Sequence, residues 1–143
     1  MKVKVFIDDR HEEEVLVYAH SRNEFVQAIE RLAEEERAPL LGHRDGETVP
    51  LKAAEVCCFI AEDSKVYAVM PQERLQVRCR LYTLEERLPT DFLKIHKSCI
   101  ANLRRIRRFR ASLGGALMVE FEGGHTEYVS RRQMKVLKER LGL

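Results

Sequence analysis

Arginine dominates the one stretch of the sequence whose residue types and spacing indicate a binding chemistry. Five of the seven residues from Arg104 to Arg110 are arginines, and no acidic residue lies among them. A guanidinium group can donate two parallel hydrogen bonds to a phosphate or to the edge of a guanine base. A solvated charged face is the ordinary alternative, but with no acid in the run internal pairing is hard to achieve. The run therefore predicts an anionic partner.

Two more arginines, Arg131 and Arg132, follow Ser130 at the start of a predicted C-terminal helix. Because a helix N-terminus carries partial positive charge, a solvated cation there costs roughly 0.3–1 kcal/mol. The pair is explained if both side chains and the free backbone N–H groups of the first turn bind phosphates together. The alternative is a surface pair whose cost is screened by salt. Ser130 is the expected N-cap under either interpretation.

No pattern of catalytic residues accompanies these arginines. The sequence has no glycine-rich phosphate loop, no H-E-x-x-H zinc motif and no nucleophile elbow, and its five histidines are scattered. The four cysteines form no C-x-x-C pair, so their spacing predicts free thiols and no metal site. We therefore expect neither an enzyme nor a cofactor.

Charge is distributed unevenly along the 143 residues. Residues 1–55 contain 8 Lys and Arg against 13 Asp and Glu, whereas residues 56–143 contain 17 against 10. A basic C-terminal part attached to an acidic N-terminal part suits a protein that presents one face to a polyanion. The sequence shows no secretion signal and no apolar run long enough to span a membrane, which predicts a soluble cytoplasmic protein without membrane insertion.

The elements that must position these residues begin with a small acidic segment, residues 1–46. Alternating apolar residues predict strands at 2–7 and 14–19, and a capping box at 21–24 predicts a helix after them. A turn-rich connector at 42–46 is the expected domain boundary. This β-β-α segment is too small to be stable alone, so we expect it to pack on the rest of the chain or on a second subunit.

The remaining residues, 47–143, are expected to form a mostly β domain with short helices, which makes the predicted fold class α+β. Apolar runs separated by turn residues predict a hairpin at 54–70, followed by a strand with a basic outer face at 75–81. Gly-Gly pairs at 114–115 and 123–124 predict a three-stranded meander, because glycine supplies the positive φ angles of tight turns.

Two further capping boxes predict the helices of this part of the chain. The first, at 83–86, opens a helix of little more than one turn that Pro89 closes. The second, at 130–133, opens the C-terminal helix, where Met134 and Leu137 begin an apolar stripe.

Two motifs stand in a defined order in the basic part of the chain. The stretch from Phe92 to Ile106 contains a His-x-Ser run, an Asn and the start of an Ile-containing strand. The second motif is the Gly-Gly pair at 123–124, followed by Tyr-Val-Ser-Arg-Arg at 128–132 and a helix. Together they resemble the LytTR family over about residues 49–143. The resemblance implies an elongated, mostly β domain of a bacterial transcription regulator that reads duplex DNA with loops, often at paired direct repeats.

The resemblance also implies which residues contact DNA. Asn102 and Arg132 match the family's base-contacting positions, where Asn suits adenine and Arg suits guanine, each pair supplying about 1–3 kcal/mol of discrimination. For Asn102 the alternative is a turn residue with left-handed geometry. A third base contact falls in the first hairpin loop, and we assign it to Lys65 because this side chain is positively charged. Phosphate contacts, which position the protein without specifying sequence, are assigned to His96, Lys97, Arg104 and Arg131.

The family's usual partner, a receiver domain, is absent, which leaves the role of the acidic segment open. It would dimerise the chain on DNA, contact a regulatory protein, or shield the basic surface. Two alternatives to sequence-specific DNA binding also stay open. One is recognition of structured RNA by the basic β surface; the other is a protein-interaction regulator that binds DNA only weakly.

Overall fold

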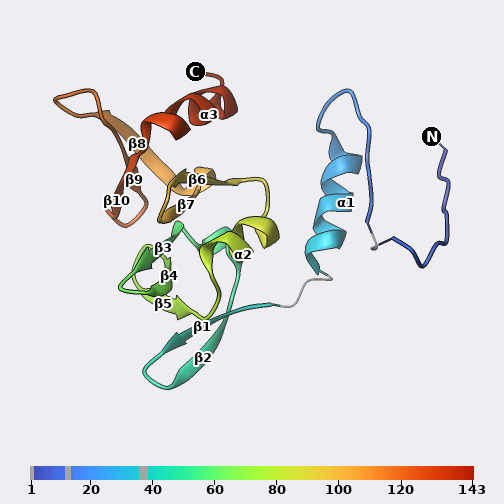
Figure 1. Ribbon diagram of the computed structural model, residues 1–143, viewed down its shortest axis with the longest axis horizontal. Coiled ribbons are helices and arrows are strands. Elements are labelled where there is room, and N and C mark those ends of the chain that lie inside the picture. Colours follow the sequence, from blue (N-terminus) through green and yellow to red (C-terminus); the bar gives the residue numbers. More distant parts are fainter. Residues whose placement is uncertain (1, 12–13, 36–38) are drawn as a thin grey trace. The chain divides into compact units, whose positions relative to one another are not determined.

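The computed structural model describes residues 2–11, 14–35 and 39–143 (Figure 1). The chain divides into two compact units, Met1–Arg37 and Ala38–Leu143. Among the described residues the first unit contains one helix, whereas the second contains ten strands, two α-helices and two short 3-10 turns. The predicted α+β class with mostly β structure is confirmed.

The helix of the first unit, α1 (Glu24–Glu35), begins two residues later than a cap at Ser21 would place it. Its N-cap is Asn23, whose side-chain Oδ1 accepts a hydrogen bond from the backbone N of Val26 at 3.0 Å. Asparagine and serine cap helices equally well, so the pattern of residue types alone does not choose between them.

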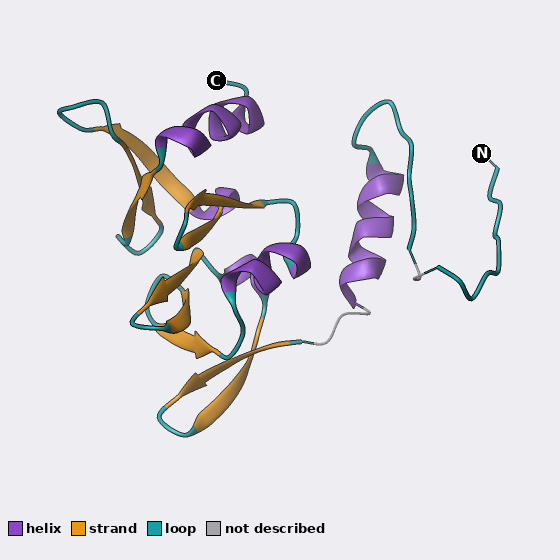
Figure 2. Cartoon of the chain, viewed as in Figure 1, coloured by secondary structure: helices purple, strands orange, loops and turns teal. Residues whose placement is uncertain are grey.

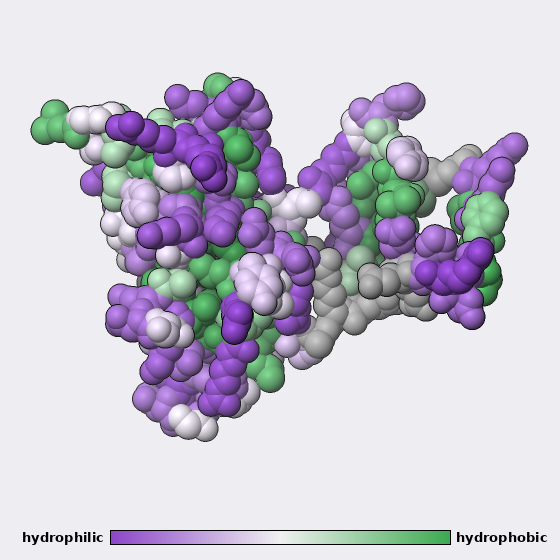
Figure 3. Space-filling model, in the orientation of Figure 1, coloured by the Kyte–Doolittle hydropathy of each residue, from purple (hydrophilic) through white to green (hydrophobic). Residues whose placement is uncertain are grey.

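The segment before α1 forms no strand in the residues that the structure describes, so the strands predicted at 2–7 and 14–19 are wrong. Alternating apolar residues specify a strand only where a partner strand supplies hydrogen bonds to the backbone. The apolar and aromatic side chains here are exposed: Phe6, Ile7 and Tyr18 are 84%, 93% and 93% exposed. Figure 3 shows green hydrophobic residues among purple polar ones on the surface of this unit. Folding of this unit alone therefore buries little apolar surface.

The strands of residues 39–143 form two antiparallel sheets (Figures 1 and 2). The larger sheet has the order β2-β1-β5-β4-β3-β7-β6, and the smaller has the order β10-β9-β8. The strands of the larger sheet are β1 (Leu40–Arg44), β2 (Glu47–Leu51), β3 (Cys58–Glu62), β4 (Lys65–Val69), β5 (Arg74–Val77), β6 (Phe92–His96) and β7 (Cys99–Asn102). The strands of the smaller sheet are β8 (Ile106–Ala111), β9 (Leu117–Phe121) and β10 (Thr126–Val129). The predicted meander is thus confirmed, and the strand predicted at 75–81 ends earlier, at Val77.

Tight turns join the hairpins, as the turn residues predict. Asp63 and Ser64 link β3 to β4 with positive φ angles of 50° and 64°, which suits the right-handed twist of the two strands. Residues 42–46, predicted to be a connector between domains, are instead part of the β1–β2 hairpin, with Asp45 and Gly46 in its turn. The same residue types favour a linker and a hairpin turn, so only the pairing of the flanking strands decides between the two.

The larger sheet is buried on both faces. One face packs against the smaller sheet and α3, and its core includes Ile60, Ile95, Phe121 and Leu137. The other face packs against α2, and its core includes Phe59 together with Val77, Leu81, Leu84 and Ile100. Adjacent residues of β3 therefore enter different cores, as the two-residue period of a strand requires.

The helices of the second unit are α2 (Leu81–Arg87) and α3 (Arg131–Leu141), and its 3-10 turns are η1 (Ala53–Glu55) and η2 (Leu103–Arg105). Helix α2 begins after Arg80 without a side-chain cap, so the capping box predicted at 83–86 is wrong, although the helix ends before Pro89 as predicted. No helix in the described part of the chain is long and apolar enough to cross a membrane.

Candidate nucleic-acid interface

Most arginines of the Arg104–Arg110 run pair with carboxylates of the chain itself. The nitrogen–oxygen distances are 3.0 Å for Arg104–Asp91, 2.8 Å for Arg105–Glu122, 2.8 Å for Arg108–Glu120 and 3.5 Å for Arg110–Glu120. The prediction that these arginines are hard to pair internally is therefore wrong, because the acids come from distant parts of the sequence. Arg107 is exposed and forms no ion pair with a described residue.

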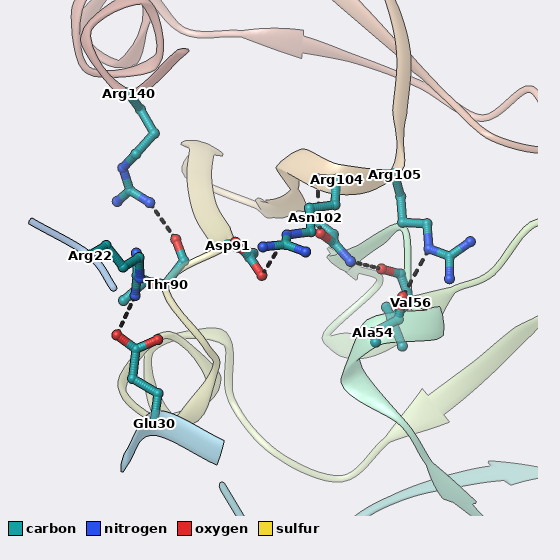
Figure 4. Close-up of polar contacts among 10 residues, drawn as sticks. All are labelled: Arg22, Glu30, Ala54, Val56, Thr90, Asp91, Asn102, Arg104, Arg105 and Arg140. Atoms are coloured by element: carbon teal, nitrogen blue, oxygen red, sulfur yellow. Dashed lines mark hydrogen bonds and ion pairs between the residues drawn. The ribbon is translucent and has the colours of Figure 1, made fainter. Parts of the chain in front are cut away.

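Asn102, predicted to contact a base, is sealed into internal hydrogen bonds at the end of β7 (Figure 4). Its side-chain Nδ2 donates to the carbonyl oxygen of Val56 at 2.9 Å, and its Oδ1 accepts from the backbone N of Arg104 at 3.1 Å. The residue is 2% exposed. A base contact would require both bonds to break, so we correct the assignment: Asn102 holds η1 and η2 to the sheet.

His96, predicted to contact a phosphate, is also buried, with 7% of its surface exposed. Its Nε2 lies 2.8 Å from a carboxylate oxygen of Glu127, and its Nδ1 accepts from the backbone N of Ser98 at 3.1 Å. The ring stacks on Tyr128 with 4.2 Å between centroids. With both nitrogens occupied, His96 is not available to a phosphate, and this assignment is corrected as well.

His125 and Cys58 belong to the same network of polar side chains. His125 Nε2 lies 2.9 Å from the second carboxylate oxygen of Glu127. Hydrogen bonds with Cys58 and with Glu127 raise the pKa of His125 to about 10. Nothing in the sequence pattern indicated this network, because Cys58, His96 and Glu127 lie on strands far apart in the chain.

The exposed cations predicted to contact DNA gather at one end of the larger sheet. Lys97 lies in the turn between β6 and β7, and the backbone O of the next residue, Ser98, accepts from the Ala61 N at 2.9 Å. Ala61 precedes the β3–β4 turn, after which Lys65 begins β4. The turns that carry Lys65 and Lys97 are therefore neighbours, and both side chains are exposed.

The N-terminus of α3 joins this end of the sheet. Ser130 is the N-cap as predicted, and its Oγ accepts from the backbone N of Gln133 at 3.3 Å. The backbone N of Ser130 donates to the carbonyl oxygen of Ile95 at 2.9 Å, so the reciprocal half of the predicted capping box is not formed. Ile95 lies two residues before Lys97, which brings exposed Arg131 and Arg132 to the same end. We call Lys65, Lys97, Arg131 and Arg132 the basic end.

Arg104 lies at the opposite end of β7 from the basic end. Phe92, the first residue of β6, pairs with Asn102, and Arg104 pairs with Asp91 beside them. The four residues of β7 span roughly 10 Å at about 3.3 Å per residue. The predicted DNA contacts therefore separate into two groups, and only the basic end combines exposed side chains that form no ion pair with described residues.

Comparison with known proteins supplies a family for this geometry. The LytTr DNA-binding domain family matches residues 46–142. A solved LytTr DNA-binding domain from Bacillus cereus covers 75% of this chain and 99% of its own with a TM-score of 0.69 and 20% sequence identity, which shows a shared fold.

Relatives of similar length extend the likeness to the first unit. Uncharacterized HTH-type transcriptional regulators from Staphylococcus aureus strains MSSA476 and N315 are each 30% identical over 146 residues, covering 100% of this chain and 99% of the relative. Despite their name, no helix-turn-helix occurs in the described part of this chain, because strands separate α1 from α2 and α2 from α3.

Proposed function

We propose that this chain, which belongs to the LytTR DNA-binding domain family, is a transcription regulator that recognises specific sequences in duplex DNA through its basic end. Its similarity to regulators along its whole length supports the regulatory part of this proposal. We assign it to the cytoplasm, where its DNA target would be reached. The finer proposal concerns which residues read the sequence.

The observation that carries the proposal is the convergence of four exposed cations from three elements. Among the described residues none of the four forms an ion pair, whereas the arginines of β8 and η2 are largely neutralised by the chain's own acids. Free cations can release counterions from DNA phosphates, which supplies the sequence-independent part of affinity. The basic end is therefore better suited to DNA than the arginine run of residues 104–110.

Base recognition is assigned to Arg132, Lys97 and Lys65. Arginine and lysine both donate to the O6 and N7 acceptors of guanine in the major groove. Lys97 lies between Ile95, whose backbone O is hydrogen-bonded to the start of α3, and Ser98, whose backbone O is hydrogen-bonded to β3 next to the β3–β4 turn. We therefore propose Lys97 as a base contact in place of Asn102.

Phosphate binding is assigned to the start of α3. Arg131 is exposed in its first turn, and the backbone N–H groups of that turn carry partial positive charge. An anion there would remove the cost of two arginines at a helix N-terminus. Such a contact would also fix the orientation of Arg132.

The binding mode proposed for the whole chain is a homodimer on paired direct repeats. The first unit, residues 1–37, is proposed as the segment that dimerises the chain or contacts a regulatory protein, and the second unit, residues 38–143, as the DNA-binding domain, because residues 40–46 belong to the β1–β2 hairpin. The exposed apolar side chains before α1 support a partner for this segment. Deletion of residues 1–35 should convert a dimer to a monomer that still binds a half-site. The mass of the deleted chain in solution measures this change.

Substitution of Arg132 by alanine tests the site. A duplex selected from a random pool and a scrambled duplex are compared by fluorescence anisotropy. We expect Arg132→Ala to weaken binding to the selected duplex by about 5–150-fold, the loss of one good base contact, and to weaken binding to the scrambled duplex much less.

Arg107→Ala is the matched control, because it removes an exposed, unpaired arginine from β8 and should leave both affinities nearly unchanged. Equal losses on the two duplexes would make Arg132 a phosphate contact. A stronger effect of Arg107→Ala than of Arg132→Ala on the selected duplex would contradict the proposal.

A further inference from the structure

A group of metal-binding side chains lies beneath the basic end. One ring nitrogen of His96, the Sγ of Cys99 and a carboxylate oxygen of Glu127 all lie within 4.8 Å of one another. They come from β6, β7 and β10. Cys99 is fully buried and His96 nearly so, in a core that is otherwise apolar. Three side chains of ligand type therefore converge on one point inside the domain.

The three groups are the ligand types that zinc takes in proteins, namely imidazole, thiolate and carboxylate. In a tetrahedral site with bonds of about 2.0–2.3 Å, ligand atoms lie about 3.3–3.8 Å apart. The three atoms are therefore close to the required spacing before any cation binds. Hard cations such as Mg²⁺ and Ca²⁺ prefer all-oxygen sites, so the thiol favours a zinc-like ion.

Neighbouring side chains orient this group, and Cys58, although its thiol is not among the atoms within 4.8 Å of one another, lies beside it. Cys58 pairs with Ala101 in the β3–β7 ladder, two residues from Cys99, so both thiols lie on the same face of the sheet. Each Glu127 oxygen has a histidine partner, with His125 on the oxygen that does not face His96. Such outer partners typically hold a ligating carboxylate in place.

We infer that the chain binds one zinc-class divalent cation through His96, Cys99 and Glu127, with Cys58 in the fourth position. The two thiols release their protons to solvent as they bind. His96 Nδ1 accepts from the Ser98 backbone N in the structure, so Nε2 carries the ring proton shared with Glu127. A cation at Nε2 moves that proton to Nδ1, which requires the Ser98 hydrogen bond to break.

Cation binding would brace two elements of the basic end. His96 directly precedes Lys97, and Glu127 lies three residues before Ser130. A bound ion would therefore fix the β6–β7 turn to the segment that leads into α3. The site itself does not depend on DNA binding, and its test uses no DNA.

Titration of the full, chemically reduced chain with Co²⁺, a spectroscopic substitute for Zn²⁺, tests the inference. We expect one Co²⁺ per chain, a near-ultraviolet thiolate-to-cobalt charge-transfer band, and displacement of Co²⁺ by Zn²⁺. Cys99→Ser should weaken the band markedly, because it removes one of the two thiolate ligands, and Glu127→Gln should weaken binding by more than about 100-fold, since even an outer partner is worth about 10–100-fold.

Cys79→Ser is the matched control, because Cys79 lies outside the group and its loss should leave Co²⁺ binding unchanged. Circular dichroism establishes that each variant is folded, and the nearly isosteric Glu127→Gln keeps the test valid if Cys99→Ser does not fold. Absence of the charge-transfer band in the wild type would overturn the inference, as would wild-type affinity in Glu127→Gln. With Zn²⁺, an unshifted Ser98 amide resonance would also overturn it.

Discussion

Replacing Asn102 by alanine separates a structural role from a DNA-reading role. The substitution removes the bond to the Val56 carbonyl at 2.9 Å and the bond from the Arg104 backbone N at 3.1 Å. Val56 is fully buried, so its carbonyl oxygen would be left without a partner. A lost hydrogen bond costs about 0.5–1.5 kcal/mol net, and a buried unsatisfied group about 1–3 kcal/mol. We expect Asn102→Ala to lower the free energy of unfolding by roughly 2–4 kcal/mol.

Urea unfolding followed by circular dichroism measures this loss, and DNA affinity is measured in parallel at a temperature where the variant stays folded. We expect a lower urea midpoint and a near-normal affinity for the selected duplex. Asn23→Ala changes the only other asparagine in the sequence, at the N-cap of α1, and should leave the unfolding midpoint of the second unit unchanged. A stability loss below about 0.5 kcal/mol, together with a large loss of specific affinity, would show that Asn102 contacts DNA and is not a structural residue.

Three further predictions concern the basic end, the β3–β4 turn and the packing of Gly123. Lys97→Ala should weaken binding to the selected duplex by about 5–150-fold, the loss of one good base contact, and should weaken binding to the scrambled duplex much less; an unchanged affinity for the selected duplex would remove Lys97 from the interface. Asp63→Asn removes a negative charge from the exposed β3–β4 turn and keeps a residue type that tolerates the positive φ of 50° at this position. Affinity for a scrambled duplex should therefore rise, and a fall would contradict the proposed contact of this turn with DNA. Gly123→Ala should lower the free energy of unfolding, measured in urea, far more than Gly124→Ala. Both residues have positive φ angles, but only at Gly123 would an added Cβ lie 2.3 Å from the Pro71 backbone oxygen. Equal losses of stability would contradict this packing.

Local turn chemistry made much of the fold predictable. Asp63-Ser64 and the two Gly-Gly pairs join strands as expected, because the positive φ angles that such turns need are a property of the residues themselves. Helix starts were less predictable. Ser130 caps α3, but the pattern at 83–86 lies inside α2, and Asn23 displaces Ser21, because several residue types near a helix start can compete for the cap.

The site was predictable only where exposure follows from the local sequence. Lys97 and Arg131 lie in a turn and at a helix start, and both are exposed. Asn102 and His96 look similar in sequence, but their partners Val56 and Glu127 are 46 and 31 residues away, so their burial depends on long-range pairing. The same limit hid the carboxylates that neutralise the arginine run and the contribution of Glu127 to the proposed metal site, whereas His96 and Cys99 of that site lie only three residues apart in the sequence.

We propose that the basic end, and not the arginine run, contacts DNA. This is tested by recording backbone amide resonances while the selected duplex is added to the protein. We expect the largest shifts at residues 63–65, 97–98 and 130–133, with small shifts along 104–111. Large shifts along 104–111 with little change at 130–133 would show that the arginine run contacts DNA instead.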